Sequence, residues 1–202
     1  MKQLGELPAR LAARPRATFT APRRAAILVP ILEVDATPAL LLTRRSDEVG
    51  SHQGQVAFPG GRMEPHDPDA IANALREAEE EVGLDPALVE VLGLLDDIPT
   101  VTGTTMVTPV VGRVTGVPRF VAQASEVARI FTIPVPELQR VERWQQRGIS
   151  WRGQEWPMYY FDHDGETLWG MSAYVTLQLL SLLPGGSPFP PPVGRPPSRR
   201  TD

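Results

Sequence analysis

The sequence predicts an α/β protein with a single domain over residues 1–183, built on a mixed β-sheet. Its 202 residues, 42% of them hydrophobic, suffice for one well-buried domain and are too few for two comfortable ones. Several short runs rich in apolar and β-branched residues predict strands, and two segments carry helical patterns. The presence of both kinds of element in one domain indicates the α/β class, with a mixed sheet.

The first two predicted strands form an antiparallel pair, because they flank a short loop that contains Asp35 and Pro38. The predicted strands, in chain order, are residues 25–32, 39–43, 55–58, 89–95, 106–114, 127–133 and 157–161.

Two helices are predicted. Asp67 followed by Pro68 is a good helix start, since a capping side chain precedes a residue suited to the first turn, and Gly83 is a plausible stop. The second helix spans residues 171–183 and is too apolar all round for an exposed surface, so we expect it to pack on the sheet.

Residues 184–202, "PGGSPFPPPVGRPPSRRTD", are rich in Pro, Gly and Ser. Such a segment cannot bury enough apolar area to offset the entropy of ordering, so we expect a mobile tail. Binding of this tail to a partner that recognises Pro-rich motifs is a less favoured alternative.

Composition excludes several classes of protein. No apolar run reaches the length of a membrane span and the start lacks the apolar core of a secretory signal, so we expect a cytoplasmic protein that does not bind membranes. The absence of cysteine excludes disulfides and thiolate metal sites, which leaves oxygen or histidine as metal ligands. A formal net charge of -4 argues against a nucleic-acid partner.

Within the first helix, the stretch "LREAEEEVG" (residues 75–83) places four glutamates in five positions. A solvated helix face is the ordinary explanation of such a charge run. However, Glu77, Glu80 and Glu81 fall on one face, away from the apolar stripe, while Glu79 points elsewhere. Three converging carboxylates offer the oxygen ligands that Mg²⁺ or Mn²⁺ prefers, which turns repulsion into coordination.

The stretch "GQVAFPGGRMEPHDPDAIANALREAEEEVGL" resembles the signature of the Nudix hydrolases: a Gly-rich loop, a helix carrying R-E-x-x-E-E and a closing Gly. Gly61 opens this box, and Arg76 to Glu81 fill its charged core. Asp67 stands one residue farther from Arg76 than the family's usual acidic position, so we interpret Asp67 as a helix cap. The resemblance implies an α/β/α sandwich around a mixed sheet.

Upstream, "LLTRRSDEVGSHQGQVAFPGG" (residues 41–61) resembles the additional motif of the coenzyme A diphosphatase branch, L-L-T-x-R-S, then an Arg, then G-x-x-x-F-P-G-G. Gly50 stands where that pattern expects its second Arg. The resemblance implies that metal-dependent hydrolysis splits coenzyme A or its thioesters into adenosine 3',5'-bisphosphate and the 4'-phosphopantetheine half.

The same resemblance implies roles for the helix residues. Glu77, Glu80 and Glu81 are the expected ligands of Mg²⁺ or Mn²⁺, and Glu77 or Glu80 can also orient or deprotonate the attacking water, with Glu126 a weaker candidate for that base. Arg76 has two readings: it contacts phosphate, or it pairs with a glutamate and holds its orientation.

Arg45 and Ser46 are the expected contacts to the nucleotide half, because an Arg fork suits phosphate. Gly60 and Gly61 are expected where the backbone turns sharply beside the substrate. The three histidines are scattered, and we place none of them in the metal shell.

Three alternatives remain open at this point. The chain can be a Nudix hydrolase of another nucleoside diphosphate derivative, such as ADP-ribose, a dinucleotide or an oxidised nucleotide, and the Gly50 departure keeps this alternative open. It can be a metal-dependent nucleotide sensor without turnover, although the presence of all three glutamates argues against lost catalysis. A homodimer is also possible, as the family resemblance implies, but the sequence indicates no interface.

Overall fold

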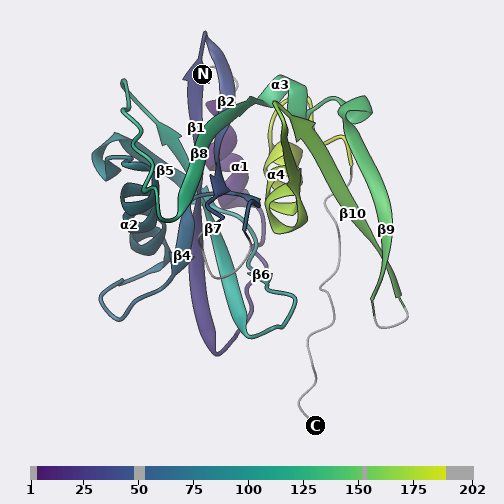
Figure 1. Ribbon diagram of the computed structural model, residues 1–202, viewed down its shortest axis with the longest axis horizontal. Helices are drawn as coiled ribbons and strands as arrows, with labels where there is room; N and C mark the ends of the chain where they lie inside the picture. The colour runs from purple at the N-terminus through teal and green to yellow at the C-terminus, as the bar shows by residue number, and fades with distance from the viewer. Residues whose placement is uncertain (1–3, 48–52, 152–153, 190–202) are drawn as a thin grey trace.

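The computed structural model describes residues 4–47, 53–151 and 154–189. Its main element is an eight-stranded mixed sheet with helices on both faces (Figure 1). The strands of this sheet are β1 (Arg23–Val34), β2 (Thr37–Arg45), β3 (Val56–Ala57), β4 (Gly60–Arg62), β5 (Val89–Leu94), β6 (Ile98–Pro99), β7 (Thr105–Val114) and β8 (Val127–Pro134). Strands β1 and β7 are parallel, whereas the other pairs are antiparallel, so the predicted mixed sheet is confirmed.

Strands β1 and β2 form the predicted antiparallel hairpin. Val34 pairs with Thr37 across a two-residue turn, in which Asp35 and Ala36 have φ angles of 48° and 61°. Positive φ at both turn residues matches the right-handed twist of the flanking strands and keeps the connection tight.

Away from the turn, strands β1 and β2 separate and pair with other strands. Strand β1 pairs with β2 from Ile31 to Val34, but its residues Ala25 to Ile27 pair with β4, while the end of β2 pairs with β3 and β8. The segment 56–62, which contains the "FPGG" motif, therefore lies between the two strands. A hydrogen bond of 2.8 Å from the Leu28 N–H to the Pro59 carbonyl holds it there.

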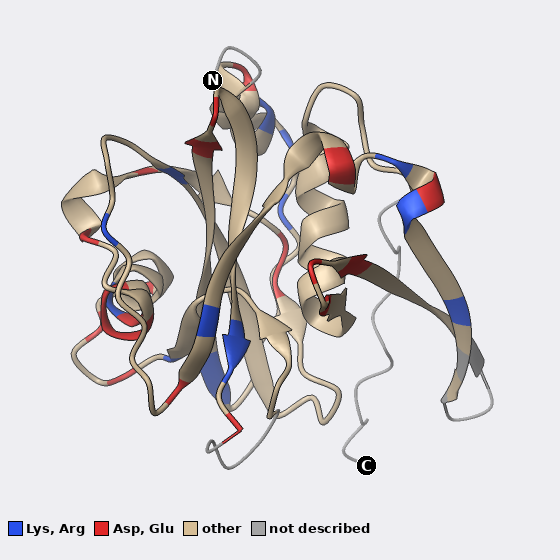
Figure 2. Ribbon diagram, turned by 45° about the horizontal axis from the view of Figure 1, so that its top comes forward, with Lys and Arg blue, Asp and Glu red and all other residues tan. Residues whose placement is uncertain are grey.

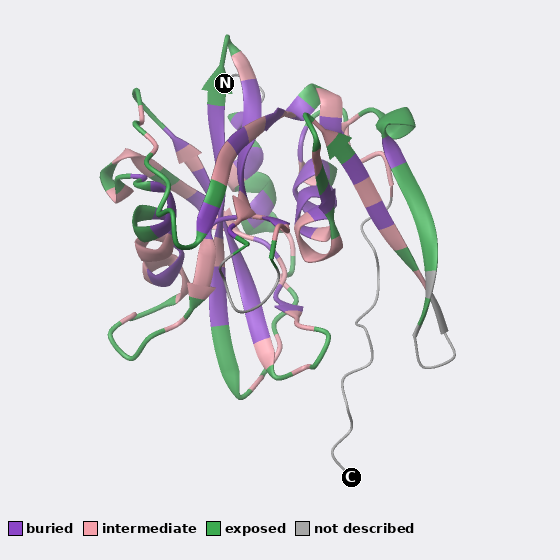
Figure 3. Ribbon diagram, in the orientation of Figure 1, coloured by how far each residue is buried: buried purple, intermediate pink, exposed green. Residues whose placement is uncertain are grey.

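Helices cover the two faces of the main sheet. Helix α2 (Ala70–Val82) packs over Ala26 and Leu28, whereas α1 (Leu7–Ala13) and α4 (Gly170–Leu182) pack over Val29 and Ile31. Alternate residues of β1 thus enter two separate cores, as the pleat of a strand requires. Figure 3 shows the buried residues concentrated in the central strands and on the inner faces of the helices. The predicted α/β/α arrangement and apolar C-terminal helix are confirmed.

A second, three-stranded sheet was not expected from the sequence. This accessory sheet consists of β9 (Trp144–Trp151), β10 (Gln154–His163) and β11 (Glu166–Trp169), and it follows the short helices α3 (Val135–Leu138) and η3 (Val141–Arg143). Asp164 and Gly165, with φ angles of 50° and 81°, make the tight turn between β10 and β11. Asp-Gly between two apolar runs is a strong hairpin signal, so this strand was predictable.

The start of the expected tail lies against the protein. The Gln139 side chain donates hydrogen bonds to the carbonyls of Pro184 (2.7 Å) and Gly186 (3.2 Å), and the Phe189 ring lies 4.8 Å from that of Tyr159. The described start of this segment, residues 184–189, thus contacts the domain through Gln139 and Tyr159. Residues 190–202 lie outside the described residues. Throughout the described ranges, every helix is too short or too polar to cross a bilayer.

Candidate active site

Helix α2 begins two residues later than predicted. The Asp69 carboxylate, not that of Asp67, accepts a hydrogen bond of 2.8 Å from the Ala72 N–H and so caps the helix. At the other end Gly83 has a φ angle of 67° and donates to the carbonyls of Ala78 and Glu79, which confirms the predicted stop. The interpretation of Asp67 as the cap is wrong, because a second Asp follows the proline and is closer to the first turn.

Asp67 instead holds Arg76. Its carboxylate accepts from the Arg76 guanidinium at 3.1 and 3.0 Å and from the Glu64 N–H at 2.8 Å, and only 3% of its side chain is exposed. These hydrogen bonds, the Arg76 one above all, lower the pKa of Asp67 to about 2. The sequence did not indicate this role, because the partner of Asp67 lies nine positions away along the chain.

Arg76 in turn connects the acidic residues of the helix. Its guanidinium donates to Glu77 at 2.9 Å, to Glu80 at 2.8 Å and to the Arg62 carbonyl at 3.3 Å. The hydrogen bond with Asp67 raises the pKa of Arg76, so the side chain stays charged. Of the two readings of Arg76, the structure has the glutamate pairing.

Glu81 is the most deeply buried of the helix glutamates, with 5% of the residue exposed. It accepts a hydrogen bond of 3.1 Å from the Gly60 N–H, and the Arg45 guanidinium lies 3.9 Å away. Burial raises the pKa of Glu81 to about 7, and the nearby charges of Glu77 and Glu126 act in the same direction.

The two glycines are explained by close approach. At Gly60, where φ is 155°, an added Cβ would lie 2.4 Å from the Ala26 carbonyl oxygen. At Gly61 it would lie 2.5 Å from the Glu77 carboxylate. A side chain at Gly60 would collide with the β1 backbone, and one at Gly61 would displace the Glu77 carboxylate, so the paired glycines let the backbone approach both.

The three glutamates do not converge as expected. Glu77 is partly buried beside Gly61, and burial raises its pKa, whereas 59% of the Glu80 side chain is exposed and turned towards Arg76. Within the described residues no three acidic or histidine side chains already form a metal-binding group. The salt bridge between Arg76 and Glu80 one helical turn apart competes with convergence.

Glu126, the weaker candidate for the base, lies near the same carboxylates. Its charge contributes to the raised pKa of both Glu77 and Glu81, and its backbone carbonyl accepts from the Ser46 N–H at 2.8 Å. The loop before β8 therefore brings a further acid to helix α2 from 45 or more positions along the chain. Only the fold determines this proximity.

Arg45 and Ser46 lie at the end of β2, beside Glu81 and Glu126. The Arg45 Nε is buried and has no hydrogen-bond partner among the described residues, and Ser46 is 6% exposed. Figure 2 shows basic residues gathered at this end of the main sheet, next to the acidic helix. Gly50 and His52, which belong to the same motif, lie outside the described residues.

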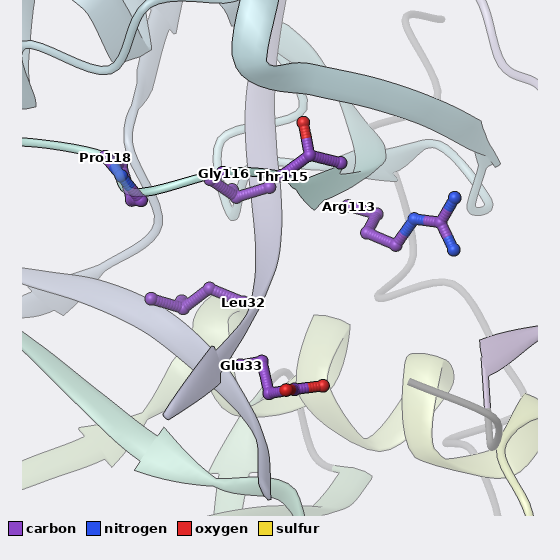
Figure 4. Close-up of a pocket in the computed structure, with 7 residues that line it drawn as sticks. Leu32, Glu33, Arg113, Thr115, Gly116 and Pro118 are labelled. Carbon is purple, nitrogen blue, oxygen red and sulfur yellow. The ribbon is translucent and has the colours of Figure 1, made fainter. Parts of the chain in front are cut away.

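Two shallow cavities lie away from these residues. One, of about 290 Å³, is lined by Leu32, Glu33, Arg113 and the segment 114–118 (Figure 4), at the far end of β1 from β4. The other, of about 270 Å³, lies along the segment 16–21 beside Arg24 and Asp97. Neither cavity is lined by a glutamate of α2.

A carboxylate cluster of this kind fits a hard divalent cation. Burial raises the pKa of both Glu77 and Glu81, the nearby charge of Glu126 adds to both shifts, and a bound cation would offset this repulsion. With no cysteine in the chain, oxygen ligands favour Mg²⁺ or Mn²⁺ over softer metals.

Comparison with known proteins decides the family. A model of the family described as the NUDIX domain matches residues 22–151, which include every residue of this site. The chain belongs to the Nudix hydrolase family. The predicted superfamily is thus confirmed.

Relatives of this Nudix hydrolase support the same family assignment. The Nudix hydrolase NudL of Photorhabdus laumondii, named as uncharacterized, is 41% identical over 157 residues, covering 78% of this chain and 83% of the relative. NudL of Pectobacterium atrosepticum, named likewise, is 42% identical over 157 residues, covering 78% and 81%. A MutT/nudix family protein of known structure from Enterococcus faecalis is 15% identical, with a TM-score of 0.50, and covers 82% of this chain and 57% of that protein. This last likeness supports the fold alone.

Family membership establishes the class of reaction. This Nudix hydrolase is an enzyme that acts on pyrophosphate bonds, and its substrates are nucleoside diphosphate derivatives. Enzymes of the family generally need divalent metal ions.

Proposed function

We propose that this Nudix hydrolase cleaves the diphosphate bond of coenzyme A or its thioesters, giving adenosine 3',5'-bisphosphate and (acyl-)4'-phosphopantetheine. The observation that carries the proposal is the position of Arg45. This residue belongs to the "LLTRRS" motif, and its guanidinium lies 3.9 Å from the Glu81 carboxylate, with the Nε unpartnered among the described residues. The coenzyme A motif and the acidic helix thus supply one site.

Glu77, Glu80 and Glu81 are the residues that would hold Mg²⁺ or Mn²⁺. When bound, the metal supplies charge neutralisation at the phosphate oxygens and lowers the pKa of a coordinated water. For Glu80 to contribute, its side chain must leave Arg76, to which it is joined by an exposed ion pair that contributes little stability.

Other residues of the chain would bind the substrate or orient the carboxylates. Arg45 offers a bidentate fork to a phosphate, and Ser46 lies beside it at the end of β2. Gly60 and Gly61 keep the backbone close to the carboxylates. Arg76, fixed by Asp67, holds the Glu77 carboxylate in place. Glu77 or Glu80, or as a weaker candidate Glu126, would accept a proton from the attacking water at a carboxylate oxygen.

Product identification tests the proposal directly. Purified protein with Mg²⁺ or Mn²⁺ is expected to convert coenzyme A to the two halves, and mass spectrometry in water enriched with heavy oxygen identifies the phosphorus attacked. The Glu80→Gln variant should lose at least about a hundredfold in kcat, since it removes a ligand of the metal. Intact coenzyme A after incubation with the wild-type protein would overturn the proposal.

A second candidate function follows from Gly50, which stands where the coenzyme A motif expects an Arg. One missing cation favours another nucleoside diphosphate derivative, such as ADP-ribose or a dinucleotide. A panel that compares coenzyme A, its form lacking the 3'-phosphate and ADP-ribose separates the two: preference for coenzyme A over the form lacking the 3'-phosphate supports the first. Binding of these compounds without any product over hours would instead indicate a nucleotide sensor.

A further inference from the structure

Two arginines face each other across strands β2 and β8. Arg44 and Arg129 are directly paired in the antiparallel register, and like charges in such positions destabilise a sheet. Glu166, the first residue of β11, lies between them: one carboxylate oxygen is 3.3 Å from the Arg129 Nη1 and the other 3.7 Å from the Arg44 Nε. One carboxylate thus serves both cations.

Of the three carboxylates that contact these arginines in the described residues, that of Glu166 is the most shielded from water. Only 13% of its side chain is exposed, whereas Asp47 and Asp164, which also contact these arginines, are 71% and 67% exposed. Because exposed ion pairs contribute little, the two aspartates cannot replace the shielded carboxylate.

The arginine pair adjoins the substrate arginine. The pairing of β2 with β8 shifts register between Arg44 and Arg45, because Arg44 pairs with Arg129 and Arg45 with Val127, which leaves one extra residue in β8. Successive side chains of a strand point to opposite faces. Arg44 therefore meets Glu166 on one face, and Arg45 meets Glu81 on the other. Any change in the spacing of β2 and β8 at Arg44 moves Arg45.

The accessory sheet fixes Glu166. The tight turn at Asp164 and Gly165 sets the first residue of β11, and the Arg129 guanidinium also donates to the Asp164 carbonyl at 2.9 Å. One turn into α4, the Ser172 hydroxyl donates to the Val56 carbonyl at 3.0 Å, which ties this unit to β3. Glu166 lies beyond residues 22–151, the span that the family model matches.

We propose that Glu166 is a positioning residue for Arg45. Its carboxylate relieves the repulsion between Arg44 and Arg129, and this fixes the end of β2 so that the Arg45 guanidinium stays beside the carboxylates of α2. The inference rests on the proposed function, because Arg45 must contact the anionic substrate for its position to matter. The accessory sheet thereby controls substrate affinity at a site to which it contributes no contacting residue.

The proposal is tested by removing the charge of Glu166 and then removing the repulsion that this charge offsets. The Glu166→Gln variant should raise the KM for coenzyme A by about fivefold or more and change kcat by less than about twofold, since binding and not the chemical step is affected. Adding Arg129→Gln removes the repulsion that Glu166 offsets, so the double variant should recover a KM near that of the wild type. If Glu166 had a purely structural role, the double variant would have a higher KM than the single variant, because it loses more contacts.

The matched control is Glu90→Gln. Glu90 forms a cross-strand ion pair with Arg113 between β5 and β7, away from β2. The KM of the Glu90→Gln variant should therefore equal that of the wild type. Thermal unfolding of each variant checks that the fold is kept.

An equilibrium measurement separates this inference from the proposed function. The dissociation constant for ADP with Mg²⁺, obtained by calorimetry, reports on Arg45 without turnover. Failure of the wild type to cleave coenzyme A would reject the proposed function, and the ADP comparison would still test Glu166. A wild-type dissociation constant in the Glu166→Gln variant, or no recovery in the double variant, would overturn the role of Glu166.

Discussion

At the scale of single residues, the site depends on how closely a backbone approaches a carboxylate. Glu81 is buried, accepts from the Gly60 N–H and has Arg45 at 3.9 Å, so its charge is neither free nor fully neutralised. A bound cation would stabilise the charged form of such a partly compensated carboxylate. The glycine and the glutamate depend on each other, although 21 positions separate them.

Stability of the metal-free enzyme should fall as pH rises. Burial raises the pKa of Glu81 from its ordinary value of 4.5 to about 7, so the folded state holds this proton more tightly than the unfolded state. The resulting stabilisation is fully present below pH 4.5 and is lost as pH rises towards 7, by on the order of 2 kcal/mol. Urea unfolding in a chelator between pH 5 and pH 8 measures this, and Glu81→Gln should flatten the profile. Equal slopes in the two proteins would contradict the assignment, and added Mg²⁺ should restore stability at pH 8 in the wild type only.

Gly60→Ala should be strongly destabilising, by about 2 kcal/mol or more, because its Cβ would lie 2.4 Å from the Ala26 carbonyl oxygen. Gly103→Ala is the control: that residue also has a positive φ, of 71°, but no heavy atom lies within 4 Å of the added carbon. It should cost only about 1 kcal/mol, from the backbone conformation alone. Chemical denaturation compares the two, and similar losses would show that the close approach at Gly60 is not tight.

At the scale of elements, helix α2 uses one aspartate to stabilise its first turn and another to orient the residues of the site. Asp69 caps its first turn, while Asp67, two positions earlier, reaches Arg76 in the middle of the helix. Sequence pattern does not distinguish the two aspartates, which stand on either side of Pro68. The helix can therefore lose its cap without losing the network that orients Glu77.

Replacement of the two aspartates should separate these functions. Asp69→Ala is expected to lower the free energy of unfolding by about 1 kcal/mol and to leave kcat/KM unchanged, since only the cap is lost. Asp67→Ala is expected to lower kcat/KM by about tenfold, because Arg76 loses the partner that fixes it. Denaturation and steady-state kinetics on the same substrate measure both. A larger activity loss for Asp69→Ala than for Asp67→Ala would reverse the assignment.

At the scale of the whole molecule, three segments meet at the split between β1 and β2. The "FPGG" segment enters between the strands, α2 lies over one face, and the loop before β8 brings Glu126 beside Glu77 and Glu81. On the other face, the accessory sheet reaches the end of β2 through Glu166. The site therefore depends on elements spread over most of the chain.

The sequence by itself determined the α/β class, the β1–β2 hairpin, helix α2 up to Gly83 and the apolar helix α4, because periodicity, turn residues and caps act within a few positions. Its motifs also selected Arg45, Gly60, Gly61 and the three glutamates. Only the tertiary structure decided that Asp67 binds Arg76, that Glu80 turns outward, that Glu126 joins the carboxylates and that Glu166 faces two arginines. Each of these is a contact between separate elements, set by how strands split and helices pack, and no local pattern encodes such a distance.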